Sequence, residues 1–250
     1  MRIQVFGPNG MLGSAVVKAI GRRGHVWESN HADLEIVMPG HIHAPVVINC
    51  AGLVKQRQYR ATRFMLINAY GPHHLAAACD TAHARLIHVS TDCLFADDGP
   101  HSESAPPDVY ADVYARSKWA GEVGAPHLTI RTSFVGFGPR GLLADLGTLP
   151  TVRASDHLLW SGHTVDTIAD LLITLAERAD VTGLLHIPGE FQTRYQLCQR
   201  LVARYELPAR IIRDDEYMAD RRLVSIRYAA LGLPELPDFG AQIEGMAPNG

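Results

Sequence analysis

Short apolar runs alternate with longer segments of helical periodicity along most of the chain. The apolar runs predict strands at 2–6, 25–27, 44–52, 85–91, 127–135, 183–188 and 209–213. Apolar positions three and four residues apart predict helices at 11–24, 64–84, 110–123, 164–178 and 193–207. Strands that alternate with helices in this way form a parallel sheet with right-handed crossovers. The pattern therefore predicts an α/β fold of the Rossmann type, a doubly wound parallel sheet.

The pattern loosens in the second half of the chain. Residues 136–162 are punctuated by Gly and Pro and show little periodicity, so we expect a loop-rich substrate region there. We expect the dinucleotide-binding core to comprise 1–137 and also to use about 162–188. The segments 138–161 and 189–250 would then form a small, interleaved C-terminal substrate lobe.

Composition narrows the class of protein. Hydrophobic residues make up 47% and charged residues 20% of the chain, as is typical of a globular protein. The net charge is about −3 and the chain has no run of basic residues, so we expect no nucleic-acid partner. No apolar stretch reaches the roughly 18 residues that span a bilayer, and the strand pattern at the very start leaves no room for a signal peptide. The four cysteines and 13 histidines lack metal-ligand spacing, so we expect no metal and a cytoplasmic protein with reduced thiols.

A glycine-rich turn follows the first predicted strand. Gly7, Gly10 and Gly13 stand three residues apart and open the first predicted helix. Such a turn needs residues without a Cβ where the chain reverses, where a pyrophosphate approaches and where helix packs on strand. The helix that follows directs free amides and its positive end at the pyrophosphate. The spacing alone is a weak signal, but its position between strand and helix predicts dinucleotide binding.

The tip of the second predicted strand bears on which dinucleotide is bound. An acidic side chain there would hold the ribose diol of NAD, and a basic one would accept the phosphate of NADP. Glu28 favours NAD if the strand ends at that residue. If the strand runs two residues further, Asn30 and His31 take the position and the argument for NAD is lost.

A tyrosine and a lysine stand four residues apart in the predicted helix 110–123. The chain has only three lysines, Lys18, Lys55 and Lys118. Tyr114 and Lys118 would lie on adjacent helical turns, where an ammonium group lowers the pKa of a phenol that exchanges protons. Ser90 and Thr91 end an apolar strand, where open α/β sheets place their ligands. The alternative is that both helical residues are ordinary surface residues, but the conjunction with the glycine turn favours a catalytic site.

These features carry a resemblance to a known family. The chain resembles the extended short-chain dehydrogenase/reductase superfamily, and within it the branch similar to dTDP-4-dehydrorhamnose reductase. The matching stretches span nearly the whole chain and include "GPNGMLG", "VINCAG", "INAYGPHHLA", "LIHVSTDCLF", "YARSKWAGE", "LTIRTSFVG" and "DRRLVSIRYAALGLPELPDF". Two departures are Cys50 in place of an alanine after the third strand and Ala115 in place of a glycine between Tyr114 and Lys118.

The resemblance implies roles for individual residues. It implies a catalytic triad of Thr91, Tyr114 as general acid and Lys118, which would also hold the nicotinamide ribose. The implied cofactor-binding residues are Gly7, Gly10, Met11, Leu12, Gly13, Asn30, Glu35, Ile36, Ala51, Gly52, Asn68, Ser90, Tyr114, Lys118, Ser133 and Phe134. We place on the substrate side Lys55, Asp92, Arg140 and Trp160. Arg140 and Trp160 could clamp a diphosphate and a base, or be ordinary loop residues.

The implied activity is NAD(P)H-dependent reduction of a keto group on a nucleotide-linked deoxysugar. The cofactor would be NADP or NAD. Epimerases and dehydratases of the same superfamily return the hydride to the sugar and remain alternatives, as does a non-catalytic, cofactor-binding regulatory subunit. The loop at Lys55 is more basic than in rhamnose-pathway reductases, which leaves the sugar open. Helix pairs in such folds often form dimers, so the oligomeric state is open between monomer and homodimer.

Overall fold

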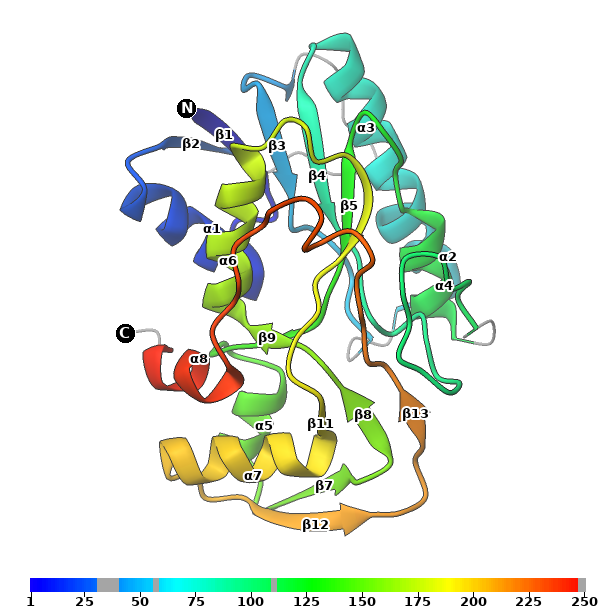
Figure 1. Cartoon of the computed structure of the whole chain (residues 1–250), viewed down its shortest axis with the longest axis vertical. Coiled ribbons are helices and arrows are strands. Elements are labelled where there is room, and N and C mark those ends of the chain that lie inside the picture. Colours follow the sequence, from blue (N-terminus) through cyan, green and yellow to red (C-terminus); the bar gives the residue numbers. More distant parts are fainter. Residues whose placement is uncertain (31–40, 56–58, 109–111, 247–250) are drawn as a thin grey trace.

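A six-stranded parallel sheet forms the larger half of the molecule (Figure 1). The computed structural model describes residues 1–30, 41–55, 59–108 and 112–246. The strands follow the order β10-β5-β4-β3-β1-β2, and every neighbouring pair is parallel. Their bounds are β1 Arg2–Phe6, β2 Val26–Asn30, β3 Val46–Asn49, β4 Arg85–Val89, β5 Leu128–Arg131 and β10 Gly183–His186. The predicted α/β class with a Rossmann-type parallel sheet is confirmed.

Helices cover both faces of this sheet (Figure 1). One face carries α1 Met11–Arg22 and α6 Val165–Ala176; the other carries α2 Ala61–Phe64, the π-helix η3 Met65–Tyr70, α3 Gly71–Thr81 and α4 Val113–Ala120. Because both faces are covered, the inner strands need apolar side chains in succession, and all four residues of β3 are buried. The helix α6 has a side-chain cap, since the Thr164 hydroxyl accepts a hydrogen bond from the Thr167 amide at its start.

The smaller lobe combines the predicted helix 193–207 and the predicted strand 209–213 with short elements that the hydrophobic pattern did not predict. The expected loop region contains α5 Leu142–Thr148, β7 Thr151–Ser155 and β8 Leu158–Trp160. Their partners come from later in the chain: β7 pairs with β12 Arg210–Asp214, and β8 with β11 Gln192–Thr193 and β13 Ala219–Asp220. Strands this short are stabilised by pairing with remote segments, which local periodicity does not report. Two further helices, α7 Arg194–Tyr205 and α8 Phe239–Gly245, complete the lobe.

The chain passes between the two halves more than once. Two short strands, β6 Phe134–Val135 and β9 His163–Thr164, pair where it leaves and re-enters the larger half, so the predicted strand 127–135 is split into β5 and β6. The segment after β13 returns along the large sheet before α8 (Figure 1). Tyr228 and Leu233 of this segment are buried in the core formed by α1, α6 and the sheet. The large-sheet core thus receives side chains from a segment expected to lie wholly in the substrate lobe.

Candidate active site

The glycine turn lies where β1 meets β3 and α1, and two of its glycines are required by packing. Gly7 has φ of +75°, and a Cβ there would lie 2.7 Å from the amide nitrogen of Ala51. A Cβ on Gly13 would lie 2.0 Å from the carbonyl oxygen of Gly7. At Gly10 the nearest atom would be that same oxygen at 3.4 Å, an ordinary contact. A Cβ at Gly10 would therefore not clash with the turn, and the glycine only leaves space beside it.

The amino end of α1 fits an anionic group. Its N-cap residue Gly10 provides no side-chain cap, and the first turn carries no acidic side chain. The first amides of the helix are therefore free to donate to oxygens of a pyrophosphate, and the helix dipole favours that charge. Met11 and Leu12, both expected at the cofactor, belong to this first turn, and Leu12 is buried.

The tip of β2 removes the argument for NAD that rested on Glu28. The strand continues to Asn30, which stands opposite Phe6 at the end of β1. Glu28 lies two residues before the strand end and forms an ion pair with Arg2, with 3.3 Å between Nε and Oε1. The strand therefore continues two residues past Glu28, which is the alternative in which Glu28 gives no argument for NAD. His31, Glu35 and Ile36 lie outside the described residues.

The three predicted catalytic residues meet at the carboxyl end of β4. The Asp112 carboxylate caps α4 by accepting a hydrogen bond from the Tyr114 amide at 2.8 Å. One turn later, the Lys118 ammonium donates to the carbonyl oxygen of Val89 at 2.7 Å. Val89 is the last residue of β4, and the buried Thr91 follows two residues later. The helix and the strand end are thus tied together by the lysine itself.

Burial changes the protonation of Lys118. The side chain is 6% exposed, and this burial lowers its pKa to about 8, although the carboxylate of Glu122 and the thiol of Cys50 act in the opposite direction. A lysine with such a pKa changes its charge within the range where enzymes work. We infer that its charged form persists below about pH 8.

The phenol of Tyr114 behaves differently from the sequence-based expectation. Burial, followed by the charge of Cys93, raises the pKa of Tyr114, and a hydrogen bond with Thr91 opposes this. Asp92 adds to the rise. The prediction that the neighbouring ammonium lowers the pKa of this phenol is therefore wrong, because the effect of burial dominates. The phenol stays protonated near neutral pH, which suits a group that must donate a proton.

The wall beside Lys118 is braced by an asparagine in the π-helix. Asn68 is 1% exposed, and its Nδ2 donates to the carbonyl oxygen of Leu53 at 3.0 Å and to Ser117 Oγ at 3.1 Å. Its Oδ1 accepts from the Leu53 amide at 2.7 Å. A Cβ on Gly52 would lie 3.3 Å from Asn68 Oδ1 and 3.9 Å from Lys118 Nζ. Asn68 thus fixes the segment after β3 against the lysine, and π-helices recur at functional sites.

Sequence reasoning missed an arginine beside Cys93 and Asp92. The guanidinium of Arg221 lies 3.3 Å from Cys93 Sγ and donates to the hydroxyl of Tyr217 at 2.7 Å. It also faces Asp92, which is 2% exposed: burial raises the pKa of that carboxyl, and Arg221 opposes the rise. Arg221 lies in the stretch "DRRLVSIR", and this was the only indication of its importance in the sequence. Its contact with Cys93 joins residues more than a hundred positions apart.

The other residues expected on the substrate side do not gather around the triad. Trp160 is 5% exposed in the core of the smaller lobe, where it packs on Phe239, and its Nε1 donates to Ser133 Oγ at 2.8 Å. Lys55 is exposed and forms an ion pair with Asp112 at the start of α4. Arg140 is exposed on the loop before α5. Trp160 therefore holds Ser133 in place, and Lys55 is linked to the start of α4 through Asp112, which also accepts from the Tyr114 amide.

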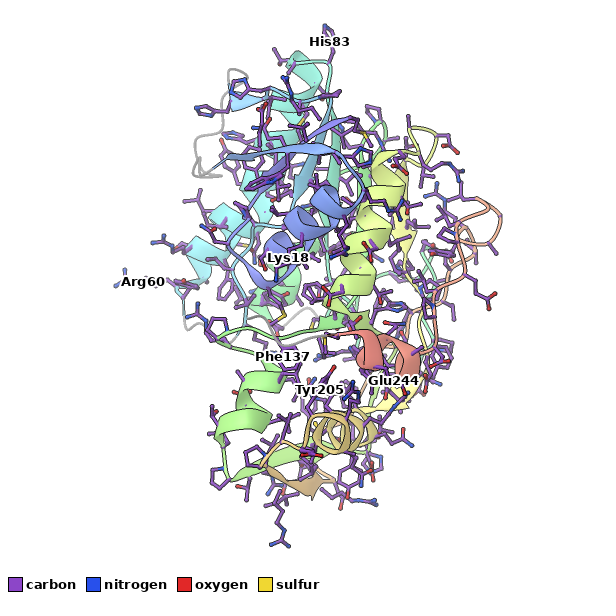
Figure 2. All side chains as sticks on the ribbon, turned by 90° about the vertical axis from the view of Figure 1, so that its left-hand side faces the viewer. Lys18, Arg60, His83, Phe137, Tyr205 and Glu244 are labelled. Carbon is purple, nitrogen blue, oxygen red and sulfur yellow. The ribbon has the colours of Figure 1, made fainter. Side chains whose placement is uncertain are left out.

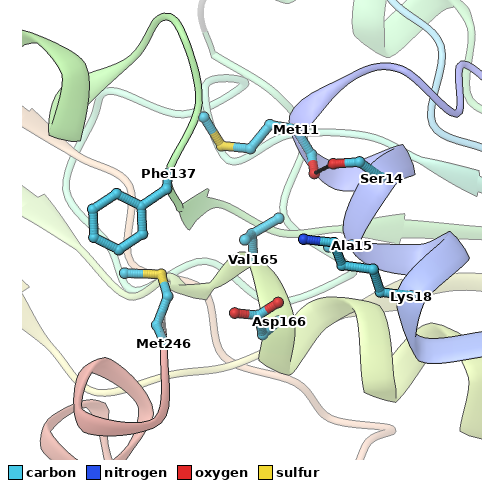
Figure 3. Close-up of a pocket in the computed structure, with 8 residues that line it drawn as sticks. All are labelled: Met11, Ser14, Ala15, Lys18, Phe137, Val165, Asp166 and Met246. Carbon is cyan, nitrogen blue, oxygen red and sulfur yellow. Dashed lines mark hydrogen bonds between the residues drawn. The ribbon is translucent and has the colours of Figure 1, made fainter. Parts of the chain in front are cut away.

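A small pocket opens beside the glycine turn, at the junction of the two halves (Figure 3). Its lining residues come from α1, α6, the chain after β6 and the chain after α8; they are Met11, Ser14, Ala15, Lys18, Phe137, Val165, Asp166 and Met246. Viewed from the side, Lys18 lies on the large half, and Phe137 and Tyr205 lie at the smaller lobe (Figure 2). The rings of Phe137 and Tyr205 are 4.9 Å apart. No member of the triad lines this pocket.

The described residues offer neither a metal cluster nor a membrane span. Among residues 1–30, 41–55, 59–108 and 112–246, no group of three or more metal-ligating side chains is found. Within the same part of the chain, no helix is long and apolar enough to cross a membrane.

Comparison with known proteins places the chain in a family. The family described as the RmlD substrate binding domain matches residues 1–221. The chain belongs to this family. A dTDP-4-dehydrorhamnose reductase of Mycobacterium tuberculosis is 32% identical over 220 residues, which cover 76% of this chain and 70% of that protein. A probable low-salt glycan biosynthesis reductase of Haloferax volcanii is 31% identical over 204 residues, covering 71% and 67%.

Solved structures share the fold of this RmlD-family chain. A dTDP-4-dehydrorhamnose reductase of Bacillus anthracis, in complex with NADP, has a TM-score of 0.84 at 18% identity over 97% of each chain. A hypothetical dTDP-4-dehydrorhamnose reductase of Sulfolobus tokodaii has a TM-score of 0.82 at 23% identity, over 99% of this chain and 100% of that one. The resemblance stated from the sequence motifs is confirmed at the level of the family.

The packing of the glycine turn gives a first testable prediction. Gly13→Ala should weaken NADPH and NADH binding at least tenfold, because the new Cβ would lie 2.0 Å from the Gly7 carbonyl oxygen and displace the turn. Cofactor fluorescence titration measures the change. Gly21→Ala in the same helix is the matched control, since nothing lies within 4 Å of its Cβ position. Equal affinities for the two variants would contradict the prediction.

Proposed function

We propose that this protein is an NAD(P)H-dependent reductase that acts on a keto group of a nucleotide-linked deoxysugar. The observation that carries the proposal is the meeting of Thr91, Tyr114 and Lys118 at the end of β4, beside a turn shaped for a pyrophosphate. Membership of the RmlD family and relatives named as reductases support the substrate class.

The proposed mechanism assigns one task to each side chain. Tyr114 protonates the oxygen of the keto group as the carbonyl is reduced, and the raised pKa of its phenol keeps that proton in place until then. Thr91 donates a hydrogen bond to the same oxygen. Lys118 holds the nicotinamide ribose and stabilises the phenolate that Tyr114 becomes. A bound nicotinamide cofactor would supply the hydride.

We assign further residues to the two ligands. The proposed cofactor site consists of Gly7, Gly10, Met11, Leu12, Gly13, Asn30, Glu35, Ile36, Ala51, Gly52, Asn68, Ser90, Ser133 and Phe134. The substrate would meet Asp92 and Arg221 on the side of the triad away from β3, with Lys55 at the entrance. Trp160 acts indirectly through Ser133, and the exposed Arg140 remains a proposed contact of the diphosphate. The core 1–137 with about 162–188 and a substrate lobe from the remainder are our proposed division, apart from the segment with Tyr228 and Leu233, which packs in the core of the large sheet.

The cofactor is NADP or NAD, and both occur among the structural neighbours. The Bacillus anthracis reductase structure contains NADP, whereas a Streptomyces venezuelae dehydratase and a Thermus thermophilus epimerase contain NAD. With Glu28 paired to Arg2, the described part of β2 offers no acidic side chain to the ribose diol.

The proposed location is the cytoplasm, and the proposed assembly is a homodimer. All four cysteines are free thiols, as suits the cytoplasm. Large apolar side chains are exposed on η3 and on α4, namely Met65, Leu66, Tyr70 and Trp119. These two elements adjoin each other, and their apolar side chains support a homodimer.

Consumption of cofactor tests the proposed reaction. With a 4-keto nucleotide sugar, one NADPH or NADH should be oxidised for each sugar reduced, measured as the loss of absorbance against product formed. An epimerase or a dehydratase would convert the sugar without net loss of cofactor. A regulatory subunit would bind cofactor, convert no sugar and co-purify with a partner. Either result would overturn the proposal.

Replacing the phenol tests the role of Tyr114. Tyr114→Phe should lower kcat by a factor on the order of 10² to 10⁴, the usual contribution of a general acid. Cofactor affinity should stay within about twofold, since the ring remains and Lys118 is untouched. Tyr228→Phe is the matched control, because it removes a phenol hydroxyl that donates to the carbonyl oxygen of Pro234, away from the triad and the proposed ligands. Unchanged turnover in Tyr114→Phe would refute the assignment.

The pKa of Lys118 predicts an alkaline limit to activity. The charged ammonium is the active form, and with a pKa of about 8 it is present below pH 8 and lost above it. We expect kcat/KM to fall about tenfold per pH unit above that value. Lys118→Arg keeps its charge and should lose this limb, at a lower overall rate because the fork geometry differs. A wild-type profile flat to pH 10 would contradict the assignment.

A further inference from the structure

A glutamate just beyond α4 links the helix to two strands of the large sheet. Glu122 lies four residues after Lys118, and its side chain is 12% exposed. Its Oε1 accepts a hydrogen bond from Ser90 Oγ at 2.7 Å and another from Arg131 Nε at 2.8 Å. Its Oε2 accepts from Arg131 Nη2 at 2.7 Å. The carboxylate is therefore bound on both oxygens and has one fixed position.

The arginine that holds this carboxylate is fixed in turn. Arg131 ends β5, and its side chain is 3% exposed. The guanidinium lies 5.5 Å from the centre of the Phe95 ring, and its Nη1 is 3.3 Å from His186 Nε2. Burial lowers the pKa of His186 to about 4, so the imidazole is neutral and can accept this bond. A buried, bidentate pair of this kind holds its geometry, unlike an exposed one.

Lys118 and Glu122 hold consecutive residues at the end of β4. The ammonium binds the carbonyl oxygen of Val89, and the carboxylate binds the hydroxyl of Ser90. Thr91 is the next residue. Two side chains four residues apart, one in α4 and one just after it, thus fix the strand end from which the proposed catalytic hydroxyl extends.

Three titratable groups at three different elements interact with the Lys118 ammonium. Glu122 follows α4, Cys50 follows β3, and His88 belongs to β4. Burial raises the pKa of Cys50 to about 12 and holds that of His88 well below 6.5, so both are neutral near pH 7. Tyr114, one turn earlier, is protonated there as well. Of these groups, only Glu122 presents a charge to the ammonium near neutral pH.

We propose that Glu122 is a positioning residue that holds the end of β4 in place and supplies the negative charge that keeps Lys118 protonated. This inference rests on the proposed function. Glu122 reaches the reacting atoms only through Ser90 and Lys118, so its effect should appear in the titration of the lysine rather than in contacts with substrate.

The scarcity of lysine makes that titration directly measurable. Competitive acetylation at a series of pH values, read by mass spectrometry, reports each of Lys18, Lys55 and Lys118 separately. In Glu122→Gln the midpoint for Lys118 should shift to lower pH than in the wild type, with the curves of the other two unchanged. Glu122→Asp should return the midpoint toward the wild-type value. An unshifted midpoint in Glu122→Gln would overturn the proposal.

Turnover should follow the same change. In Glu122→Gln, the alkaline limb of the kcat/KM profile should move to lower pH by the same amount as the acetylation midpoint of Lys118. A midpoint lower by one pH unit should therefore reduce kcat/KM above pH 8 about tenfold relative to the wild type. Because acetylation needs neither cofactor nor substrate, the charge on Lys118 can be tested even if no nucleotide sugar is reduced. A protein without reductase activity but with a shifted Lys118 curve would refute the proposed function and leave this inference standing.

Two variants separate positioning from loss of structure. Glu103→Gln is the matched control: this half-buried carboxylate binds Ser225 and the His186 amide, at the far side of the same network. Glu103→Gln should lower the stability of the fold and leave the acetylation midpoint of Lys118 unchanged. A shifted midpoint in this variant would mean that general loss of structure moves the titration of Lys118, and it would overturn the proposal. If Glu122→Gln does not fold, Glu122→Gln with Arg131→Met removes the unpaired buried charge as well. Because loss of the Arg131 charge by itself raises the midpoint, the double variant is compared with Arg131→Met alone. Its Lys118 midpoint should be lower than in Arg131→Met, and equal midpoints would contradict the proposal.

Discussion

The ammonium of Lys118 is the interaction on which the candidate site depends. It is taken out of water between α4 and the end of β4, where it binds the carbonyl oxygen of Val89. An unpaired buried charge would cost several kcal/mol, so the surroundings must supply acceptors and a compensating charge. They do so through Val89 and Glu122, and the same contacts determine where Thr91 and Tyr114 lie. The contacts that stabilise the buried lysine are therefore the same ones that position the proposed catalytic residues.

A second constraint is steric and concerns the approach of β1, β3 and α1. Gly7 and Gly13 are needed because the Ala51 amide and the Gly7 carbonyl occupy the space where a Cβ would stand. The close approach leaves the amides at the start of α1 free to bind an anion. Asn68 then fixes the segment after Ala51 against Lys118. The proposed pyrophosphate and ribose sites are thus parts of one packed junction.

The sequence predicted this junction because its signals are local. Strand, glycine turn and helix are contiguous, and Tyr114 and Lys118 are separated by one helical turn. Where the decisive contact was remote, the sequence misled or was silent. Glu28 suggested an NAD contact, but its strand continues and the carboxylate pairs with Arg2. Arg221 reaches the site from the far end of the chain, and no spacing rule could place it beside Cys93.

By itself, the sequence determined the parallel α/β class, the position of the glycine turn and the identity of the proposed acid and its lysine. These follow from periodicity and from spacings no longer than about one helical turn or one tight loop, which the backbone converts into fixed geometry. The tertiary structure alone decided the protonation of Tyr114 and Lys118, since burial sets both pKa values. It also decided that Trp160 belongs to the core of the smaller lobe and that residues 136–162 form short strands and a helix. Desolvation and pairing between distant segments depend on the whole fold, so no local stretch of sequence contains them.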